Sequence, residues 1–179
     1  ALEKRPEIDQ RRVTVGGHSR LGKTALWCGA QDERFCCAIS NNSGAGGAAI
    51  FRGKVGERVS DMEKYGIWDW FCENYRGWAG REGDAPFDQH FLLACMSPRK
   101  LAVGSASLDE WADPVSEYLA CHAASPAWAR LGAAGFTAPD RLPEPDDFFP
   151  EGDIEYHLRP GIHYHSRYDW QRYMRFLAP

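Results

Sequence analysis

Val13-Thr14-Val15-Gly16-Gly17-His18-Ser19-Arg20-Leu21-Gly22-Lys23-Thr24 is the stretch that decides the fold of this 179-residue chain. A β-branched run ends at two glycines, a short polar turn follows, and residues 21–30 have the spacing of a helix with one apolar face. The stretch therefore predicts a strand, a sharp turn and a helix. A turn of this kind places its polar residues at one end of a sheet, where chemistry can be done.

Two chemistries fit this turn. In a nucleophile elbow, Ser19 would stand on a strained turn and attack a carbonyl, although Leu21 occupies the place of the second glycine in G-x-S-x-G and Gly22 comes one residue late. In a phosphate loop, Gly17 and Gly22 to Thr24 satisfy G-x-x-x-x-G-K-[ST]. The phosphate loop lacks a partner, because neither residues 36–40 nor 101–105 end in an acidic residue that could hold magnesium. A glycine turn that merely precedes a core helix is the third interpretation.

The composition predicts a globular domain, with 44% hydrophobic and 13% aromatic residues. The net charge is −4, so neither nucleic acid nor an anionic membrane is an expected partner. No apolar run approaches the roughly 20 residues that a membrane helix needs. The cysteines lack the spacing of a metal site, so we expect buried free thiols, with one disulfide left open.

Apolar runs predict strands at residues 12–16, 35–40, 100–105 and 154–158, the last with alternating character. Helices are expected at 21–30, from Pro86 or Asp88 to about Met96, from Asp113-Pro114 to about 124, and at 168–177. Strands that alternate with helices indicate an α/β fold with a parallel sheet covered on both faces. The connection 137–153 should lie on the surface, and the aromatic cluster within the irregular residues 52–84 should pack in the core. That cluster contains Trp68, Trp70, Phe71, Tyr75 and Trp78.

Three chemically suited residues follow predicted strands. Ser19 follows the first strand, Asp109 the third and His163 the fourth. Ser, Asp and then His is the chain order of α/β-hydrolase triads, in which an imidazole takes the serine proton and a carboxylate holds the imidazole. Glu110 and Asp113 are alternative acids, and His165 is an alternative base.

The turn resembles the G-C/H-S-R-x-G-K signature of glucuronoyl esterases, carbohydrate esterase family 15, in which the glycine is displaced in the same way. Later blocks are similar to that family in the same order, most closely to its bacterial members. They are Ser43-Gly44-Ala45-Gly46-Gly47, Pro86-Phe87-Asp88-Gln89-His90, Ser97-Pro98-Arg99, Trp111-Ala112-Asp113-Pro114, Arg159-Pro160-Gly161-Ile162-His163 and Tyr168-Asp169-Trp170.

The resemblance implies an α/β-hydrolase fold and a serine esterase. Such an enzyme cleaves the ester between glucuronic acid of glucuronoxylan and a lignin alcohol, needs no cofactor or metal, is secreted or periplasmic, and acts as a monomer. The resemblance also implies that residues 1–179 are the C-terminal portion of one catalytic domain whose earlier strands are absent. We therefore expect the chain alone to expose a sheet edge and to be poorly soluble or inactive.

The resemblance also implies roles for single residues. Ser19 would be the nucleophile, His163 the general base, and Arg20 would help to bind the oxyanion through its N–H and guanidinium. Lys23 would bind uronic acid hydroxyls, and Trp111 would pack on the sugar. These two have structural alternatives: a solvated charge for Lys23 and a core residue for Trp111.

One position departs from the family pattern. Fungal members place the acid of the triad where this chain has Asn42, and a neutral amide cannot stabilise an imidazolium as a carboxylate does. Asp109 is therefore the expected acid. Glu57 is a further candidate for the sugar pocket. An acetyl xylan esterase, a nucleotide-binding module and a non-catalytic carbohydrate-binding protein remain alternative functions.

Overall fold

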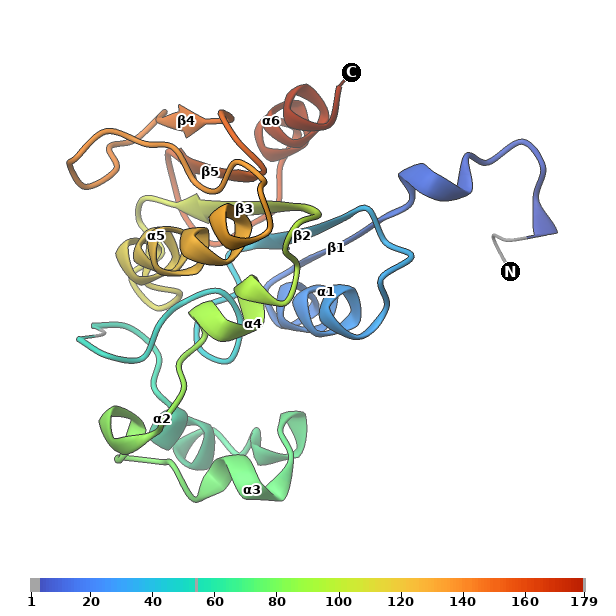
Figure 1. The fold of residues 1–179 in the computed structure, drawn as a ribbon. Coiled ribbons are helices and arrows are strands. Elements are labelled where there is room, and N and C mark those ends of the chain that lie inside the picture. The colour runs from blue at the N-terminus through green and yellow to red at the C-terminus, as the bar shows by residue number, and fades with distance from the viewer. Residues whose placement is uncertain (1–3, 54, 179) are drawn as a thin grey trace.

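The computed structural model describes residues 4–53 and 55–178, which form a sheet with helices on both faces (Figure 1). The sheet has five strands in the order β1-β2-β3-β5-β4, and all neighbours are parallel except β4, which pairs with β5 in the antiparallel direction. The parallel strands end at the same sheet edge, so the residues that follow them are brought together. The strands are β1 (Thr14–His18), β2 (Cys37–Asn41), β3 (Lys100–Ala106), β4 (Phe148–Phe149) and β5 (Ile154–Arg159).

The helices divide between the two faces. One face carries α1 (Arg20–Gln31), α4 (His90–Ala94) and α5 (Pro114–Arg130), and α6 (Arg167–Leu177) lies on the opposite face (Figure 1). Two apolar clusters result. The larger packs side chains of the three helices against the sheet, and the smaller packs Tyr173 and Phe176 of α6 against Ile39 and Ala102. None of the helices in the described ranges is both long and apolar enough to cross a membrane.

The four predicted strands are present, with boundaries that move by one or two residues. The alternating pattern expected for residues 154–158 is wrong, because all six residues of β5 are buried between α5 and α6. The short strand β4 was not predicted. It lies within the connection that the sequence places on the surface, and two phenylalanines carry too little pattern to reveal a strand.

Two helices differ in length from the prediction. The helix expected from Pro86 or Asp88 to Met96 shortens to α4, His90–Ala94. In contrast, α5 continues past Pro126 to Arg130 instead of ending near Ala124. Trp128 explains this extension: its side chain is fully buried and its Nε1 donates to the Arg99 carbonyl at 2.9 Å. Packing of this large side chain outweighs the backbone hydrogen bond that Pro126 removes.

Residues 52–84 form a lobe of short helices beside α4 rather than an irregular connection (Figure 1). The expectation that its aromatic residues pack in the core is wrong for Trp70, which is 43% exposed, and Phe71 stacks on Tyr75 at the wall of a cavity. The sheet core is already filled by side chains of α1, α4 and α5, so Trp70 lies at the surface of the lobe while Phe71, Tyr75 and Trp78 are partly buried outside that core. The lobe contains α2 (Val59–Lys64), the 3₁₀ turns η3 (Trp68–Trp70) and η4 (Glu82–Asp84), and α3 (Glu73–Arg76). Outside the lobe, another 3₁₀ turn, η2 (Gln10–Arg12), precedes β1.

The cysteines of the described residues are free, but they are not all buried. Cys37 and Cys121 are buried, as expected, whereas Cys72 and Cys95 are exposed. Burial raises the pKa of the Cys121 thiol, which makes it a packing residue rather than a nucleophile.

Candidate active site

Ser19 lies at the junction of β1 and α1 in a strained conformation. Its φ is 59° and its ψ is −129°, and its backbone N–H donates to the Asn41 carbonyl at 2.8 Å. A non-glycine residue adopts such a conformation only where the surroundings enforce it, and the nucleophile elbow is the recurrent case. The Ser19 side chain makes no capping hydrogen bond to the helix that it begins. Its hydroxyl is therefore not used to hold the helix in place.

The displaced glycine has a structural reason. A Cβ on Gly22 would lie 3.0 Å from the Ser43 Cβ and 3.2 Å from the Gly17 carbonyl oxygen, and a Cβ on Gly17 would lie 2.2 Å from the Leu21 carbonyl oxygen. Gly17 and Gly22 thus let the first turn of α1 cross closely over the strand ends. The two glycines serve the elbow although their spacing is not that of G-x-S-x-G.

Asp109 and His163 form the closest polar contact at this sheet edge. His163 Nδ1 lies 2.5 Å from Asp109 Oδ2, with the carboxylate 5% exposed and the imidazole 42% exposed. Burial alone would raise the pKa of Asp109, but hydrogen bonds from His163 and Asn42 outweigh it and hold this pKa below its ordinary value. The same hydrogen bond raises the pKa of His163, against the opposing effect of burial. An ionised carboxylate therefore faces the Nδ1–H of the imidazole.

The alternative acids and base have other contacts. Asp113 caps α5 by accepting the Ser116 N–H at 3.1 Å, and Glu110 is exposed. His165 stacks on Trp170, with ring centroids 5.0 Å apart. The structure thus pairs His163, not His165, with Asp109, and neither Glu110 nor Asp113 takes the place of Asp109.

Ser19 stands at the same sheet edge as Asp109 and His163, since each of the three follows a parallel strand. The hydrogen bonds of residues 4–53 and 55–178 include none between Ser19 and His163. Such contacts are often long before a substrate binds and tighten in its complex.

Lys23 is buried rather than solvated. Its ammonium lies 2.6 Å from the Ser43 carbonyl, 2.5 Å from the Ala45 carbonyl and 3.3 Å from Glu57 Oε2. An ammonium has three hydrogens to donate, so these acceptors occupy it fully. Burial lowers the pKa of Lys23, and the charge of Glu57 opposes this shift.

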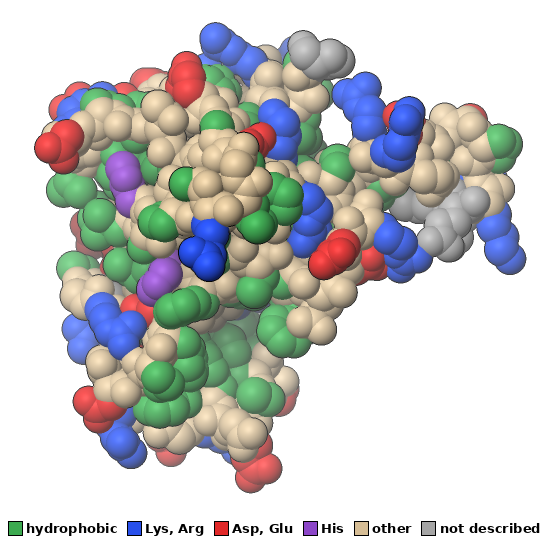
Figure 2. Space-filling model, in the orientation of Figure 1, with side chains coloured by type: hydrophobic (Ala, Val, Ile, Leu, Met, Phe, Trp, Pro, Cys, Tyr) green, Lys and Arg blue, Asp and Glu red, His purple; other side chains and the backbone are tan. Residues whose placement is uncertain are grey.

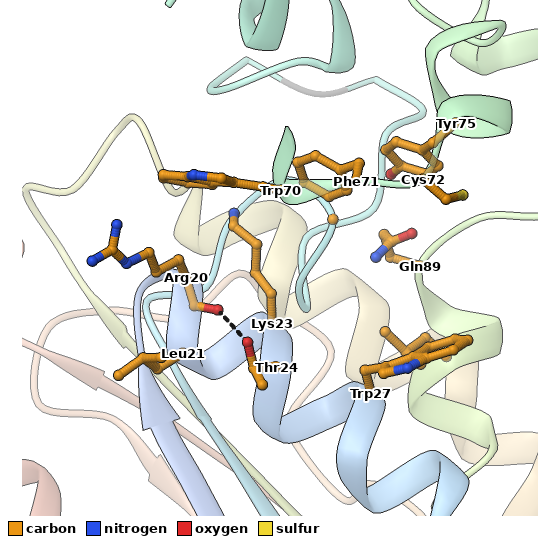
Figure 3. A pocket seen from close by; sticks show the side chains of 12 residues that line it. Arg20, Leu21, Lys23, Thr24, Trp27, Trp70, Phe71, Cys72, Tyr75 and Gln89 are labelled. Carbon is orange, nitrogen blue, oxygen red and sulfur yellow. Dashed lines mark hydrogen bonds between the residues drawn. The ribbon is translucent and has the colours of Figure 1, made fainter. Parts of the chain in front are cut away.

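The same contacts argue against a phosphate loop. In such a loop the lysine and the following hydroxyl are directed to phosphates and magnesium. Here Lys23 is held by protein oxygens, and the Thr24 hydroxyl donates to the Arg20 carbonyl at 3.2 Å (Figure 3). The interpretation of Gly17 to Thr24 as a nucleotide site is wrong, because the residues that would hold phosphate are already bonded within the chain.

Arg20 and Trp111 are both accessible. The Arg20 guanidinium lies 5.6 Å from the ring centroid of Trp70, within the range of a cation–π contact. Trp111 is 46% exposed and meets the Tyr65 ring edge to face at 5.4 Å. The core alternative for Trp111 is therefore wrong. Both side chains are therefore open to contact with a bound molecule.

A cavity of about 760 Å³ lies between α1, α4 and the lobe of residues 52–84. Figure 2 shows apolar side chains gathered around a hollow on this face, and Figure 3 shows Trp70 and Phe71 on the lobe side, with Arg20, Lys23 and Trp27 on α1. Aromatic walls with a few polar groups are typical of ligand pockets. The lining residues are Arg20, Leu21, Lys23, Thr24, Trp27, Gly46, Trp70, Phe71, Cys72, Tyr75, Gln89 and Leu92.

Two supporting residues were not identified from the sequence. Asn42 Nδ2 donates to Asp109 Oδ2 at 2.8 Å. The sequence marks Asn42 only as the absence of a carboxylate, whereas in the structure its amide supports the carboxylate of Asp109. Glu117 is fully buried in α5 and accepts from the backbone N–H groups of Ser43 and Gly44 at 2.8 and 3.0 Å, and from the Ser105 hydroxyl at 2.6 Å. A single acid among apolar helix residues was the only signal that the sequence offered for Glu117.

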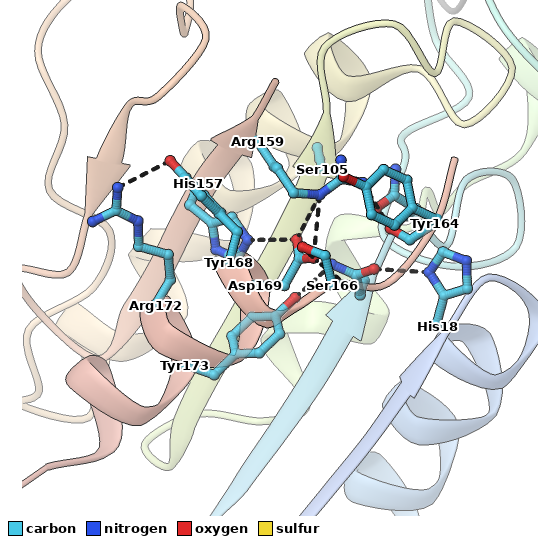
Figure 4. Close-up of polar contacts among 12 residues, drawn as sticks. His18, Ser105, His157, Arg159, Tyr164, Ser166, Tyr168, Asp169, Arg172 and Tyr173 are labelled. Atoms are coloured by element: carbon cyan, nitrogen blue, oxygen red, sulfur yellow. Dashed lines mark hydrogen bonds and ion pairs between the residues drawn. The ribbon is translucent and has the colours of Figure 1, made fainter. Parts of the chain in front are cut away.

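A buried polar network lies behind the His163 loop (Figure 4). Asp169 accepts from Arg159 at 3.2 Å and from Asn41 at 3.2 Å, and His157 Nε2 lies 3.2 Å from the same carboxylate. Through Asn41 the network reaches His18, whose Nδ1 lies 2.7 Å from Asn41 Oδ1. Although histidines and acids gather here, no group of three such side chains in the described part of the chain is arranged to hold a metal ion.

Comparison with known proteins gives a consistent result. A family model described as "Glucuronyl esterase, fungi" matches residues 1–132. Carbohydrate esterase MZ0003, from an unknown prokaryotic organism, is 43% identical over 98% of this chain and 40% of its own length. The 4-O-methyl-glucuronoyl methylesterase of Cerrena unicolor is 34% identical over 75% of this chain and 30% of its own length.

Solved structures agree with the sequence matches. A glucuronoyl esterase from Solibacter usitatus is 45% identical, covers 98% of this chain and 44% of its own, and superposes with a TM-score of 0.90. The chain thus spans less than half the length of the relatives that it matches. The predicted fold class is confirmed as that of an α/β-hydrolase. With a family model over most of its length and relatives of this similarity, the chain belongs to the glucuronoyl esterases of carbohydrate esterase family 15.

Proposed function

We propose that the protein carrying this chain is a serine esterase that hydrolyses esters of glucuronic acid in glucuronoxylan with lignin alcohols. The observation that supports it most is the contact of 2.5 Å between Asp109 and His163, at the sheet edge that also holds the strained Ser19. The names of the relatives, carbohydrate esterase and 4-O-methyl-glucuronoyl methylesterase, support the same substrate class.

In the first half of the reaction, Ser19 Oγ attacks the ester carbonyl while His163 Nε2 takes its proton. Asp109 holds the Nδ1–H of His163 and stabilises the imidazolium that forms. The negative charge that develops on the carbonyl oxygen meets the backbone N–H of Arg20, which lies in the first turn of α1, where N–H groups have no partner within the helix. The alcohol then leaves with the proton from His163, and Ser19 carries the acyl group.

In the second half, water attacks the acyl-enzyme and His163 again accepts the proton. The acid is released and the Ser19 hydroxyl is restored. No other group is needed to balance these steps, because each proton that His163 takes is returned to a leaving oxygen.

The substrate binds to side chains around the sheet edge that carries Ser19. Trp111 presents an exposed ring on which a sugar can pack, and the positive charges of Arg20 and Lys23 lie near the elbow. Because Lys23 is bonded to Ser43, Ala45 and Glu57, it binds a sugar hydroxyl only by giving up one of these acceptors. A polymeric substrate also places the enzyme outside the cytoplasm, either secreted or periplasmic.

The test is ester hydrolysis by the full-length protein. Benzyl glucuronate should be hydrolysed by the unaltered protein and by Ser60→Ala, a change at an exposed serine of α2, but not by Ser19→Ala. Release of acetate from acetylated xylan at a higher kcat/KM than release of glucuronic acid would assign the site to an acetyl esterase instead. Full activity of Ser19→Ala would reject the serine mechanism.

A further inference from the structure

His18 is the last residue of β1 and the neighbour of Ser19 in the chain. Its ring lies against that of His163, with centroids 4.5 Å apart and a tilt of 41°. The sequence pattern indicates only a structural or surface position for His18. Its contact with the proposed base therefore needs an explanation of its own.

The hydrogen bonds behind His18 determine which of its nitrogens carries the proton. Asn41 Nδ2 donates to the Tyr173 hydroxyl at 2.8 Å and to Asp169 Oδ1 at 3.2 Å, which directs Asn41 Oδ1 at His18 Nδ1, 2.7 Å away. Asp169 can only accept, because hydrogen bonds from His157 and Ser166 overcome the effect of burial and lower its pKa. An amide oxygen needs a donor, so His18 carries its proton on Nδ1.

This arrangement fixes the His18 ring to the sheet. One end of the ring is bonded to β2 through Asn41, and its backbone belongs to β1. Figure 4 shows His18 joined in this way to the buried network around Asp169. His18 thus presents a rigid ring face to the His163 loop.

His163 needs such a contact. Its side chain is 42% exposed, and the hydrogen bond to Asp109 holds it at Nδ1. One hydrogen bond at one ring atom leaves the ring free to swing about that bond. A second ring packed against it removes this freedom without occupying Nε2, which the reaction needs.

We propose that His18 is a positioning residue, whose ring, fixed by Asn41, holds the His163 ring in the orientation that serves both Asp109 and Ser19. The proposal rests on the function proposed above and adds a residue to it. His18 itself exchanges no proton with the substrate.

The charges around the pair agree with this role. Burial lowers the pKa of His18 more than its hydrogen bond to Asn41 raises it, and the charge of His163 lowers it further, so protonation of His163 favours the neutral form of His18. Asp109, Glu117 and Lys23 act on His163. Asp169 and Asp109 act on His18, and the ring of His165 stacks on that of His18 with centroids 5.8 Å apart. A neutral His18 does not repel the imidazolium that the reaction forms beside it.

The test uses full-length protein with ¹⁵N-labelled histidines, so that the His163 ring is observed without any substrate. In His18→Ala we expect the Nδ1 proton of His163 to exchange faster with water and the pKa of His163 to fall, because its hydrogen bond to Asp109 loosens. His18→Phe keeps a ring at this place but loses the hydrogen bond to Asn41, so its effect should be smaller than that of His18→Ala. His90→Ala, a change at a histidine of α4, is the matched control and should leave His163 unchanged.

Kinetics give the second readout. His18→Ala should lower kcat about tenfold while KM changes less than about twofold, since a misplaced base slows chemistry and not binding. Unchanged exchange and pKa of His163 in His18→Ala would overturn the proposal. With an active unaltered protein, an unchanged kcat in His18→Ala would also overturn it. The resonance experiment stands even if no glucuronate ester is hydrolysed, so failure of the proposed function would be recognised separately.

Discussion

Asn42 and His163 share one acceptor: Asn42 Nδ2 lies 2.8 Å and His163 Nδ1 2.5 Å from Oδ2 of Asp109. The Asn42 side chain is buried, and its Oδ1 has no partner among the described residues. Asn42 thus supplies a donor that helps to keep Asp109 ionised. The amide of Asn42 and the carboxylate of Asp109 therefore act as one hydrogen-bonded unit.

Replacing Asn42 by Asp should therefore impair the site. Two carboxylates at this distance share one proton at low pH, and when both ionise they place additional negative charge beside His163, which raises its pKa. We expect the acid limb of the kcat/KM profile of Asn42→Asp to move to higher pH, with a larger loss of activity at pH 6 than at pH 8. Asn42→Ala, which removes the donor without adding charge, should shift the limb less. Coincident profiles for Asn42→Asp and the unaltered protein would contradict this account.

The pH dependence of the unaltered enzyme follows from the same contact. The base must be neutral to accept a proton, and Asp109 raises the pKa of His163 above its ordinary value of 6.5. The acid limb of kcat/KM should therefore lie above pH 6.5. In Asp109→Asn this limb should fall to lower pH while kcat drops by a factor of about 10³. A profile of Asp109→Asn with an unmoved limb would show that another acid serves His163.

Stability depends on pH with opposite signs for the two partners. The pKa of Asp109 is lowered from 3.8, so its contribution is present above pH 3.8 and is lost as the pH falls through the lowered value. The pKa of His163 is raised from 6.5, so its contribution is present below pH 6.5 and is lost as the pH rises through the raised value. The advantage of unaltered protein over His163→Ala in thermal unfolding should be largest between these limits. An advantage that grows above pH 9 would contradict the assignment.

Glu117 gives a prediction about stability. Its carboxylate accepts from two backbone N–H groups of the loop after β2 and from Ser105, and it is fully buried. Glu117→Ala leaves these donors unsatisfied and should lower the free energy of unfolding by about 3 kcal/mol. Glu110→Ala, a change at an exposed glutamate, should alter it by less than about 0.5 kcal/mol. Denaturant unfolding of both variants checks this difference, and equal midpoints would contradict it.

The sequence predicts β2 and β3 because a buried parallel strand has a nearly continuous apolar run, whereas β5 is recognised from alternating apolar residues. The sequence also indicates which residues follow the strands, and so predicts that Ser19, Asp109 and His163 lie at one sheet edge. These predictions depend on local pattern and on a general rule of sheet geometry. That is why they required no knowledge of which side chains touch.

The remaining features depend on contacts between distant segments. His18 and His163 are far apart in the chain, and Glu117 accepts from Ser43, which lies 74 residues before it. The aromatic residues of the lobe have the composition of a core, and only the packing of α1, α4 and α5 shows that the core is already full. Burial, not composition, distinguishes these cases, and burial is a property of the folded chain.

Arg159 leads to the last prediction, because it organises the loop that carries His163. Its guanidinium is buried and donates to the carbonyls of Pro160 at 3.0 Å, Ile162 at 2.9 Å and Tyr164 at 2.7 Å, while its Nε donates to Asp169. These carbonyls lie on both sides of His163, so one side chain fixes the backbone before and after the proposed base. A lysine has the charge but not the planar fork that spans several acceptors.

Arg159→Lys should therefore lower the free energy of unfolding by about 2 kcal/mol, because carbonyls that Arg159 satisfied lose their donor. It should also lower kcat about tenfold through displacement of His163. Arg167→Lys, at an exposed arginine at the start of α6, is the control for the charge-preserving change and should affect neither quantity. Thermal unfolding and kcat are measured on the same preparations. A variant Arg159→Lys with reduced stability but unchanged kcat would show that the loop keeps its conformation through Asp109 and His18 alone, since those contacts to His163 do not involve the guanidinium.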